Sequence, residues 1–119
     1  MNVEDLRNYC LSLPGVLENR PWTEPQYEIL ITFTVGDKWF CLFNPEEKFV
    51  DVKCNPEVTV EMQSQYEGAF PAWHMNKEHW LGVRLESDVP DEQIRALIDA
   101  GYKLVVAGLS KKRKEESGL

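Results

Sequence analysis

Both histidines of the chain lie in one short segment, between two of its four tryptophans. This segment reads Trp73-His74-Met75-Asn76-Lys77-Glu78-His79-Trp80. A histidine can act as a general base near neutral pH, and a lysine can hold an anion. No serine or cysteine stands nearby in the sequence as a nucleophile, and the chain has no glycine-rich phosphate loop or nucleophile elbow. We therefore expect no catalytic residues and a protein that is not an enzyme.

The spacing of the two histidines also argues against a metal site. His74 and His79 are five residues apart, too far for two ligands on one face of a helix. A closed zinc site would need two more ligands, and neither a CxxC nor an HExxH pattern is present. We expect no metal and no cofactor. Two interpretations of the segment remain open: an ordered loop anchored by its tryptophans, or a surface that contacts a partner.

Periodicity predicts the elements that must position this segment. Apolar residues at helical spacing predict a helix after Asn2 that stops at Pro14-Gly15. The start Asn55-Pro56-Glu57, a cap followed by a proline and an acid, predicts a second helix that runs to about Tyr66. Alternation predicts strands at residues 27–35, 38–43, 49–53 and 79–86, whereas residues 69–77 show no clear period. The last helical region runs from about residue 88 to 109, and Gly101 is expected to break it, as one bent helix or as two. Strands grouped before helices favour an α+β class, with an antiparallel sheet of about five strands and helices on one face.

Length and charge limit the function further. The 119 residues suit one domain, expected at residues 1–110 with a disordered tail at residues 111–119. The formal net charge is −7, and it becomes −9 without the four bases and two acids of residues 111–116. An acidic body repels polyanions at long range. The acidic start, the lack of a long apolar run and the three scattered cysteines (Cys10, Cys41, Cys54) predict a cytoplasmic protein with reduced thiols and no membrane partner.

Five strings of residues, in register along the chain, resemble those of the MmcQ/YjbR family of small bacterial proteins. The central one is the aromatic-His-Met-Asn-Lys-x-His-Trp signature at residues 73–80. The others are Cys10-Leu11-Ser12-Leu13-Pro14-Gly15-Val16, Lys53-Cys54-Asn55-Pro56-Glu57, Val89-Pro90-Asp91 and Tyr102-Lys103-Leu104-Val105. Two positions depart from the family pattern: Pro21-Trp22-Thr23 replaces a Pro-Phe-Gly-like motif, and Gly101 replaces a serine. The resemblance implies a two-layer α+β domain similar to frataxin-like and secretion-chaperone-like folds, with a double-wing sheet that is commonly described as DNA-binding.

Two functions follow as hypotheses, with a small-ligand carrier as a third. The first is DNA binding through the sheet face and the signature segment, where basic strand and turn residues would contact phosphates. The second is a protein-interaction or chaperone-like module, because an acidic surface with exposed aromatic rings suits a basic or amphipathic partner. A monomer is the favoured oligomeric state. The candidate binding residues are Lys53, Trp73, His74, Asn76, Lys77, His79 and Arg84, with Lys38 and Lys48 as further bases for DNA.

Overall fold

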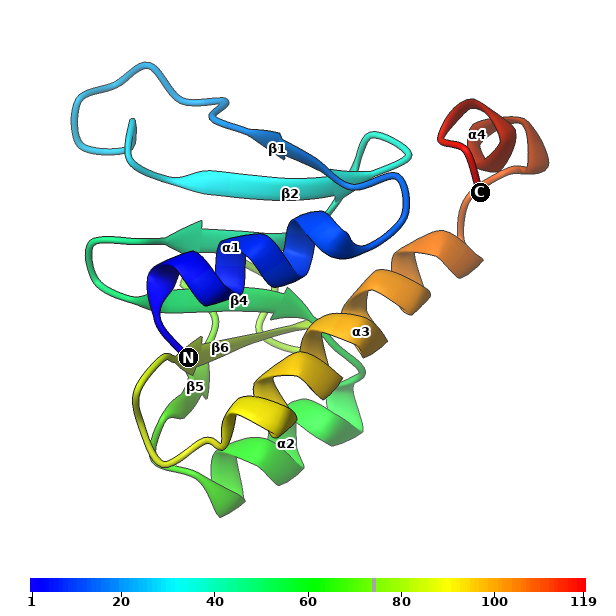
Figure 1. Cartoon of the computed structure of the whole chain (residues 1–119). Helices are drawn as coiled ribbons and strands as arrows, with labels where there is room; N and C mark the ends of the chain where they lie inside the picture. The colour runs from blue at the N-terminus through cyan, green and yellow to red at the C-terminus, as the bar shows by residue number, and fades with distance from the viewer. Residues whose placement is uncertain (74) are drawn as a thin grey trace.

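A six-stranded antiparallel sheet with the strand order β1-β2-β3-β4-β6-β5 forms the centre of the molecule (Figure 1). The structure is a computed structural model that describes residues 1–73 and 75–119. Its strands are β1 (Leu17–Asn19), β2 (Ile31–Val35), β3 (Lys38–Asn44), β4 (Phe49–Lys53), β5 (Ala69–Pro71) and β6 (Trp80–Arg84). The predicted α+β class with an antiparallel sheet is confirmed, with six strands in place of about five.

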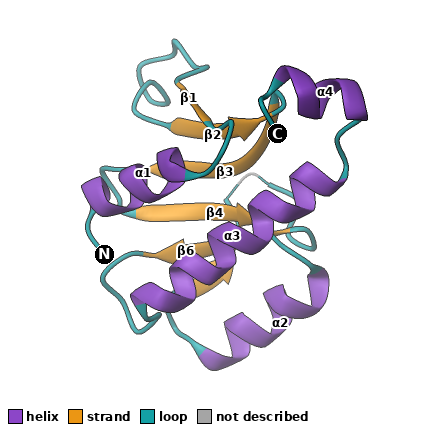
Figure 2. Ribbon diagram, turned by 45° about the vertical axis from the view of Figure 1, so that its right-hand side comes forward, coloured by secondary structure: helices purple, strands orange, loops and turns teal. Residues whose placement is uncertain are grey.

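Helices cover one face of this sheet. Figure 2 shows α1 (Val3–Ser12) and α3 (Asp91–Ala107) lying across it, with α2 (Pro56–Gln65) beside the β5–β6 edge. Alternate residues of the strands point to this face and pack against the helices. The resulting core includes Leu6, Phe33, Phe43, Val50, Leu81, Ile94 and Ile98, all with no exposed surface. Burial of this apolar surface is the main favourable contribution to folding.

Local sequence explains where the helices begin. Asn2 caps α1: its side-chain oxygen accepts from the Asp5 N–H at 2.8 Å, and the Asp5 carboxylate accepts from the Asn2 N–H at 3.1 Å. This reciprocal pair satisfies two N–H groups that the helix leaves unpaired. In α2, Pro56 stands in the first turn, where its missing N–H costs nothing.

Gly101 does not break the last long helix, contrary to the sequence-based expectation. Helix α3 is continuous from Asp91 to Ala107, and Gly101 is buried within it. A Cβ atom at this position would lie 2.6 Å from the carbonyl oxygen of Lys53 on β4. The glycine therefore lets the helix backbone approach the sheet closely, which outweighs the helical propensity that it lacks.

Two short strands and a turn also differ from the prediction. The three-residue strands β1 and β5 add an edge at each side of the sheet; no strand was predicted at residues 17–19, and residues 69–77 show no clear period in the sequence. Strand β2 begins at Ile31, not near Tyr27, because the preceding residues form a turn. In this turn the Tyr27 N–H donates to the Glu24 carbonyl at 2.9 Å, and the Leu30 N–H donates to the Tyr27 carbonyl at 3.0 Å.

The C-terminal residues form a short helix, where the sequence predicted a disordered tail. Helix α4 (Lys111–Glu116) is capped by the Ser110 side chain. Its Arg113 guanidinium donates to the Asp37 carboxylate at 2.8 Å and to the Gly36 carbonyl at 3.2 Å, at the turn between β2 and β3. Within the described residues, no helix is long and apolar enough to cross a membrane.

Candidate binding site

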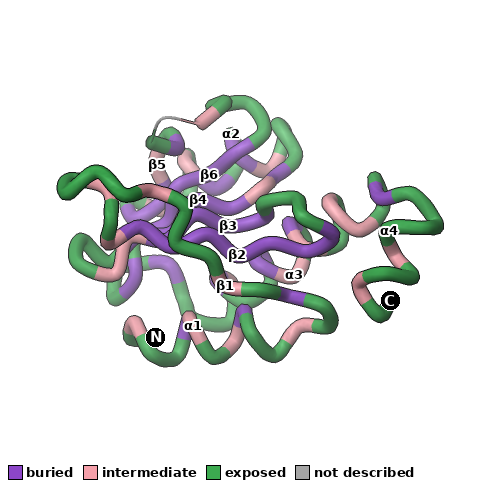
Figure 3. The backbone as a smooth tube through the Cα atoms, turned by 90° about the horizontal axis from the view of Figure 1, so that it is seen from above, coloured by how far each residue is buried: buried purple, intermediate pink, exposed green. Residues whose placement is uncertain are grey.

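The sheet face opposite the helices carries the candidate site, and we call it the loop face. Strand register aligns one row of residues across it: Thr32, Leu42, Asp51, Gly82 and Phe70. Thr32, Leu42 and Asp51 are buried although they point away from the helices. Figure 3 shows that β2, β3, β4 and β6 are buried along most of their length. The loop at residues 20–30 and Trp73 meet over this face, since the Tyr27 and Trp73 rings lie 6.0 Å apart.

Two polar side chains are buried on the loop face and find no hydrogen-bond partner among the described residues. Thr32 and Asp51 have no exposed surface. Within the described residues, neither the Thr32 hydroxyl nor either carboxylate oxygen of Asp51 has a hydrogen-bond partner. Burying a polar group unpaired costs about 1–3 kcal/mol, and more for a charged one. These positions therefore carry a cost that apolar residues of the same size would not.

Burial changes the titration of the Asp51 carboxyl group. Burial raises its pKa from the ordinary value of 3.8 to about 7. The Trp73 backbone N–H and the Lys77 ammonium lie close enough to oppose this shift, because both favour the carboxylate. Lys77 in turn donates from Nζ to the Ala72 carbonyl at 3.1 Å. The signature segment thus supplies the groups that partly compensate the buried acid.

An open cavity of about 170 Å³ lies where the two loops meet, lined by Trp22, Tyr27, Leu30 and Trp73. We call it the aromatic pocket. Trp73 is 37% exposed, whereas Trp22 and Tyr27 are half-buried. Trp22 also packs edge-on against Trp39 of β3, with ring centres 5.5 Å apart. Aromatic rings fixed by such contacts present apolar area at low entropic cost, which suits them to binding.

Three of the predicted binding residues supply positive charge on or above the loop face. Lys53 Nζ lies 5.4 Å from the centre of the Trp80 ring, and the Arg84 guanidinium lies 4.9 Å from the centre of the Phe70 ring. Because β4 and β6 run antiparallel, these two cations stand at opposite ends of the strand pair, with Asp51 between them. Both are cation–π contacts, which orient the charged groups along the sheet.

The other predicted binding residues do not share one role in the structure. Asn76 is structural: its side-chain oxygen accepts from the Glu78 N–H at 2.9 Å and the His79 N–H at 3.2 Å, which fixes the turn. The His79 side chain is exposed, and its carbonyl accepts from the Cys54 N–H at 2.9 Å. His74 lies outside the described residues. Within the part of the chain that is described, no group of three His, Cys, Asp or Glu side chains could hold a metal ion.

Sequence reasoning missed Asp51, Thr32 and the aromatic residues of the 20–30 loop. Asp51 interrupts the apolar run Phe49-Val50-Asp51-Val52, a signal that was visible but consistent with an outward-facing polar residue. Trp22 stands beside Pro21 and near Pro25, a pattern typical of an irregular connection. Only the fold shows that this connection lies against the signature segment.

These features define a small α+β domain with helices on one face of an antiparallel sheet and loops on the other. The chain belongs to the YjbR family, whose model matches residues 11–104.

Among its relatives, the uncharacterized protein YjbR of Escherichia coli (strain K12) is 29% identical over 119 residues, covering 97% of this chain and 96% of that protein. The uncharacterized protein YyaQ of Bacillus subtilis (strain 168) is 30% identical over 114 residues, covering 85% of this chain and 95% of that protein. The crystal structure of the Deinococcus radiodurans protein DR2400 has a TM-score of 0.85 and 31% identity, covering 99% of this chain and 88% of that one. A crystal structure of a Pseudomonas syringae protein has a TM-score of 0.73 and 27% identity, covering 87% of this chain and 98% of that one.

Proposed function

We propose that this chain is a non-catalytic binding protein that captures a short basic segment of another protein. An apolar side chain of that segment would insert into the aromatic pocket. The observation that carries the proposal is the pocket itself. Three aromatic rings from two loops surround an open cavity of about 170 Å³, large enough for one apolar side chain. A partly exposed aromatic cluster beside an opening is the usual form of a binding hot spot.

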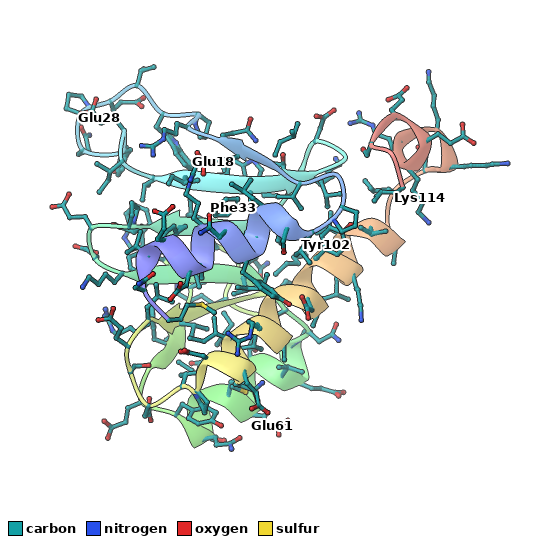
Figure 4. All side chains as sticks on the ribbon, viewed as in Figure 1. Glu18, Glu28, Phe33, Glu61, Tyr102 and Lys114 are labelled. Carbon is teal, nitrogen blue, oxygen red and sulfur yellow. The ribbon has the colours of Figure 1, made fainter. Side chains whose placement is uncertain are left out.

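The charge around the pocket favours a basic partner. Glu24 and Glu28 are exposed on the same loop as Trp22 and Tyr27, and Figure 4 shows Glu28 at the far end of that loop. The whole chain carries a formal net charge of −7. Acidic groups around an apolar pocket attract a basic segment and speed its association. The pocket would supply affinity, and the surrounding acids would supply selectivity.

DNA binding is the second candidate, supported by the position of Lys53, Lys77 and Arg84 on or above one face. Each of these cations already contacts an aromatic ring or a carbonyl oxygen. Lys48, a further predicted base, lies 3.7 Å from the Glu86 carboxylate. Tight binding to duplex DNA rests on several cations that are free to release counterions from phosphates. The pocket therefore supports a protein partner more strongly than the cations support DNA.

A selection experiment separates the two candidates. The whole protein is used to select from a random library of twelve-residue peptides, and the enriched peptides are measured by fluorescence anisotropy. A labelled random-sequence duplex DNA is titrated in parallel at two salt concentrations. We expect enriched peptides with one large apolar residue flanked by lysine or arginine, and no DNA binding at the higher salt concentration.

Variants locate the binding site. Trp73→Ala and Tyr27→Ala should each weaken binding of the selected peptide by about tenfold or more, as removal of a hot-spot ring does. Val60→Ala is the control, because Val60 is 69% exposed on α2, away from the pocket. Peptide binding that is unchanged in both aromatic variants would contradict the proposal. Salt-sensitive duplex binding that is lost in Lys53→Gln and Arg84→Gln would assign the surface to DNA.

A further inference from the structure

A second cavity on the loop face, of about 370 Å³, lies over the β1–β2 edge. It is separate from the aromatic pocket, with which it shares no lining residue. Its lining includes Asn19 and Arg20 at the end of β1, Thr32 and Thr34 of β2, and Trp39 of β3. Register places Asn19 beside Thr32, so Arg20 follows directly at the same end of the cavity. We call it the β1–β2 cavity.

Two of its polar groups are available to a ligand. The Thr32 hydroxyl lines the cavity, has no exposed surface, and has no hydrogen-bond partner within the described residues. The neighbouring Thr34 hydroxyl differs, because it accepts a hydrogen bond from Asn19 Nδ2 at 3.1 Å. Arg20 is exposed, and its side chain makes no ion pair or hydrogen bond with any described residue. A buried unpaired donor costs free energy that a ligand acceptor would recover.

The net charge available in the cavity is positive. The one acid among its described lining residues, Asp37, is already paired with Arg113 of α4 at 2.8 Å. Arg20 therefore supplies the uncompensated charge. A guanidinium matches a carboxylate in geometry, with two parallel N–H donors for its two oxygens. A single guanidinium on a chain of net charge −7 suits one negative charge better than the two of a phosphate dianion.

The cavity also has an apolar wall, to which Trp39 contributes. The Trp39 indole is 36% exposed and is held edge-on by Trp22 at 5.5 Å, so its orientation is fixed. Leu17 and Pro21 complete the apolar lining. Small-ligand sites typically combine such a wall with a few convergent polar groups. A ring or branched apolar group placed against Trp39 would let an attached carboxylate reach Arg20.

We propose that the β1–β2 cavity binds a small organic carboxylate with an aromatic or branched apolar body. Its carboxylate pairs with Arg20 and accepts from the Thr32 hydroxyl, and its body packs against Trp39. This site shares no lining residue with the proposed peptide site and uses a different chemistry, although Trp22 of the aromatic pocket packs against its Trp39.

The test is an NMR titration of the ¹⁵N-labelled whole protein with three compounds of one shape. Phenylacetate carries the carboxylate, phenylacetamide is its neutral analogue, and phenethylamine is its cationic analogue; inorganic phosphate is a fourth probe. We expect phenylacetate to shift the Thr32 and Thr34 amides and the Trp39 indole N–H signal. Phenylacetamide should bind about tenfold more weakly, since it lacks the charge-assisted pair. The cationic analogue and phosphate should leave these signals unchanged.

Variants assign the contacts. Arg20→Gln should weaken phenylacetate binding about tenfold. Arg95→Gln, an exposed arginine on α3, should leave it unchanged. Thr32→Val should weaken binding while leaving the unfolding temperature of the free protein equal or higher, which a purely structural role for the hydroxyl would not produce. Equal affinity for the acid and the amide, unchanged affinity in Arg20→Gln, or shifts confined to other regions would overturn the proposal. Phosphate that shifts the same signals more strongly than phenylacetate would overturn the choice of a carboxylate.

Discussion

The two faces of the sheet are built from alternate residues of the same strands, yet they differ in almost every physical property. On the helix face, Phe33, Phe43 and Val50 are fully buried against α1 and α3 in a continuous apolar core. On the loop face, Thr32 and Asp51 are equally buried but lack hydrogen-bond partners within the described residues. The helix face also has no partly exposed tryptophan, whereas Trp39 and Trp73 both belong to the loop face.

This difference underlies our proposal that the helix face carries the stability of the fold and the loop face carries binding. Apolar burial on the helix face lowers the free energy of the folded state. The unpaired groups of the loop face raise it. Features that cost stability without improving packing are characteristic of functional sites. We therefore propose that the helix face stabilises the fold and that ligands contact the loop face, and each half of this proposal can be tested.

The largest change in stability is expected when a substitution creates a cavity in the core on the helix face. Phe33→Ala removes a fully buried ring and should lower the free energy of unfolding by about 3–5 kcal/mol. Urea denaturation followed by tryptophan fluorescence measures the change. The folded fraction of this variant should still bind the selected peptide with wild-type affinity. A loss below about 1 kcal/mol would mean that the helix face does not dominate stability.

On the loop face, Asp51→Asn should raise the free energy of unfolding, by an amount that depends on pH. A carboxyl whose pKa is 3.8 when unfolded and about 7 when folded binds more protons in the folded state between these values. The stability of the wild type therefore falls as the pH rises from about 4 to about 7, by up to about 4 kcal/mol. Asn cannot ionise, so the variant loses this dependence.

Denaturation of both proteins at pH 4, 6 and 8 tests this. The variant should be more stable than the wild type at pH 8, and the gap should shrink as the pH falls. Glu47→Gln, an exposed acid in the turn before β4, is the control and should follow the wild-type curve. A constant gap at all three pH values would show that the Asp51 carboxyl does not titrate as described.

Substitution of two threonines on the same strand should change the stability by a smaller amount and only at one of them. Thr32→Val removes the unpaired hydroxyl and should raise the free energy of unfolding by about 1 kcal/mol. Thr34→Val, two residues along the same strand and face, removes the acceptor of the 3.1 Å hydrogen bond from Asn19 and should give no such gain. Equal changes in thermal denaturation of the two variants would contradict the distinction between them.

The smallest effect concerns the cation above Asp51. The Lys77 ammonium lowers the pKa of Asp51, so Lys77→Met should raise that pKa further. A ¹³C carboxyl titration of Asp51 by NMR measures the shift directly. Lys103→Met on α3 serves as the control and should leave the titration unchanged. An unchanged Asp51 titration in Lys77→Met would show that the Lys77 charge does not influence the pKa of Asp51.

The strongly patterned parts of the fold could be predicted from the sequence. The alternation in β3 and β4, the Asn2 cap of α1 and the proline in the first turn of α2 are local signals that each predict their own element. The three-residue strands β1 and β5 could not be found in this way, because they are too short to show a period. The predicted helix break at Gly101 was wrong for a related reason. This glycine allows a close approach to Lys53 on β4, and a contact between distant segments leaves no local sequence pattern.

The candidate site could be predicted only in part. The signature segment was recognised, and Lys53, Lys77 and Arg84 are on or above the face that it covers. Period-two alternation puts Asp51 on the same strand face as Lys53, but it cannot distinguish a solvent-facing residue from one that is buried under a loop. Trp22 and Tyr27 complete the pocket through contacts between distant segments, which a single sequence does not reveal.

The most direct test of the central claim maps where a ligand touches the protein. A ¹⁵N–¹H NMR titration of the whole chain with the highest-affinity selected peptide would report every amide that senses binding. We expect shifts concentrated in residues 20–30, in Trp73 and residues 75–79, and in the facing positions of β3 and β4. Shifts confined to the helix face, or to the basic residues of α4, would contradict the assignment of binding to the loop face.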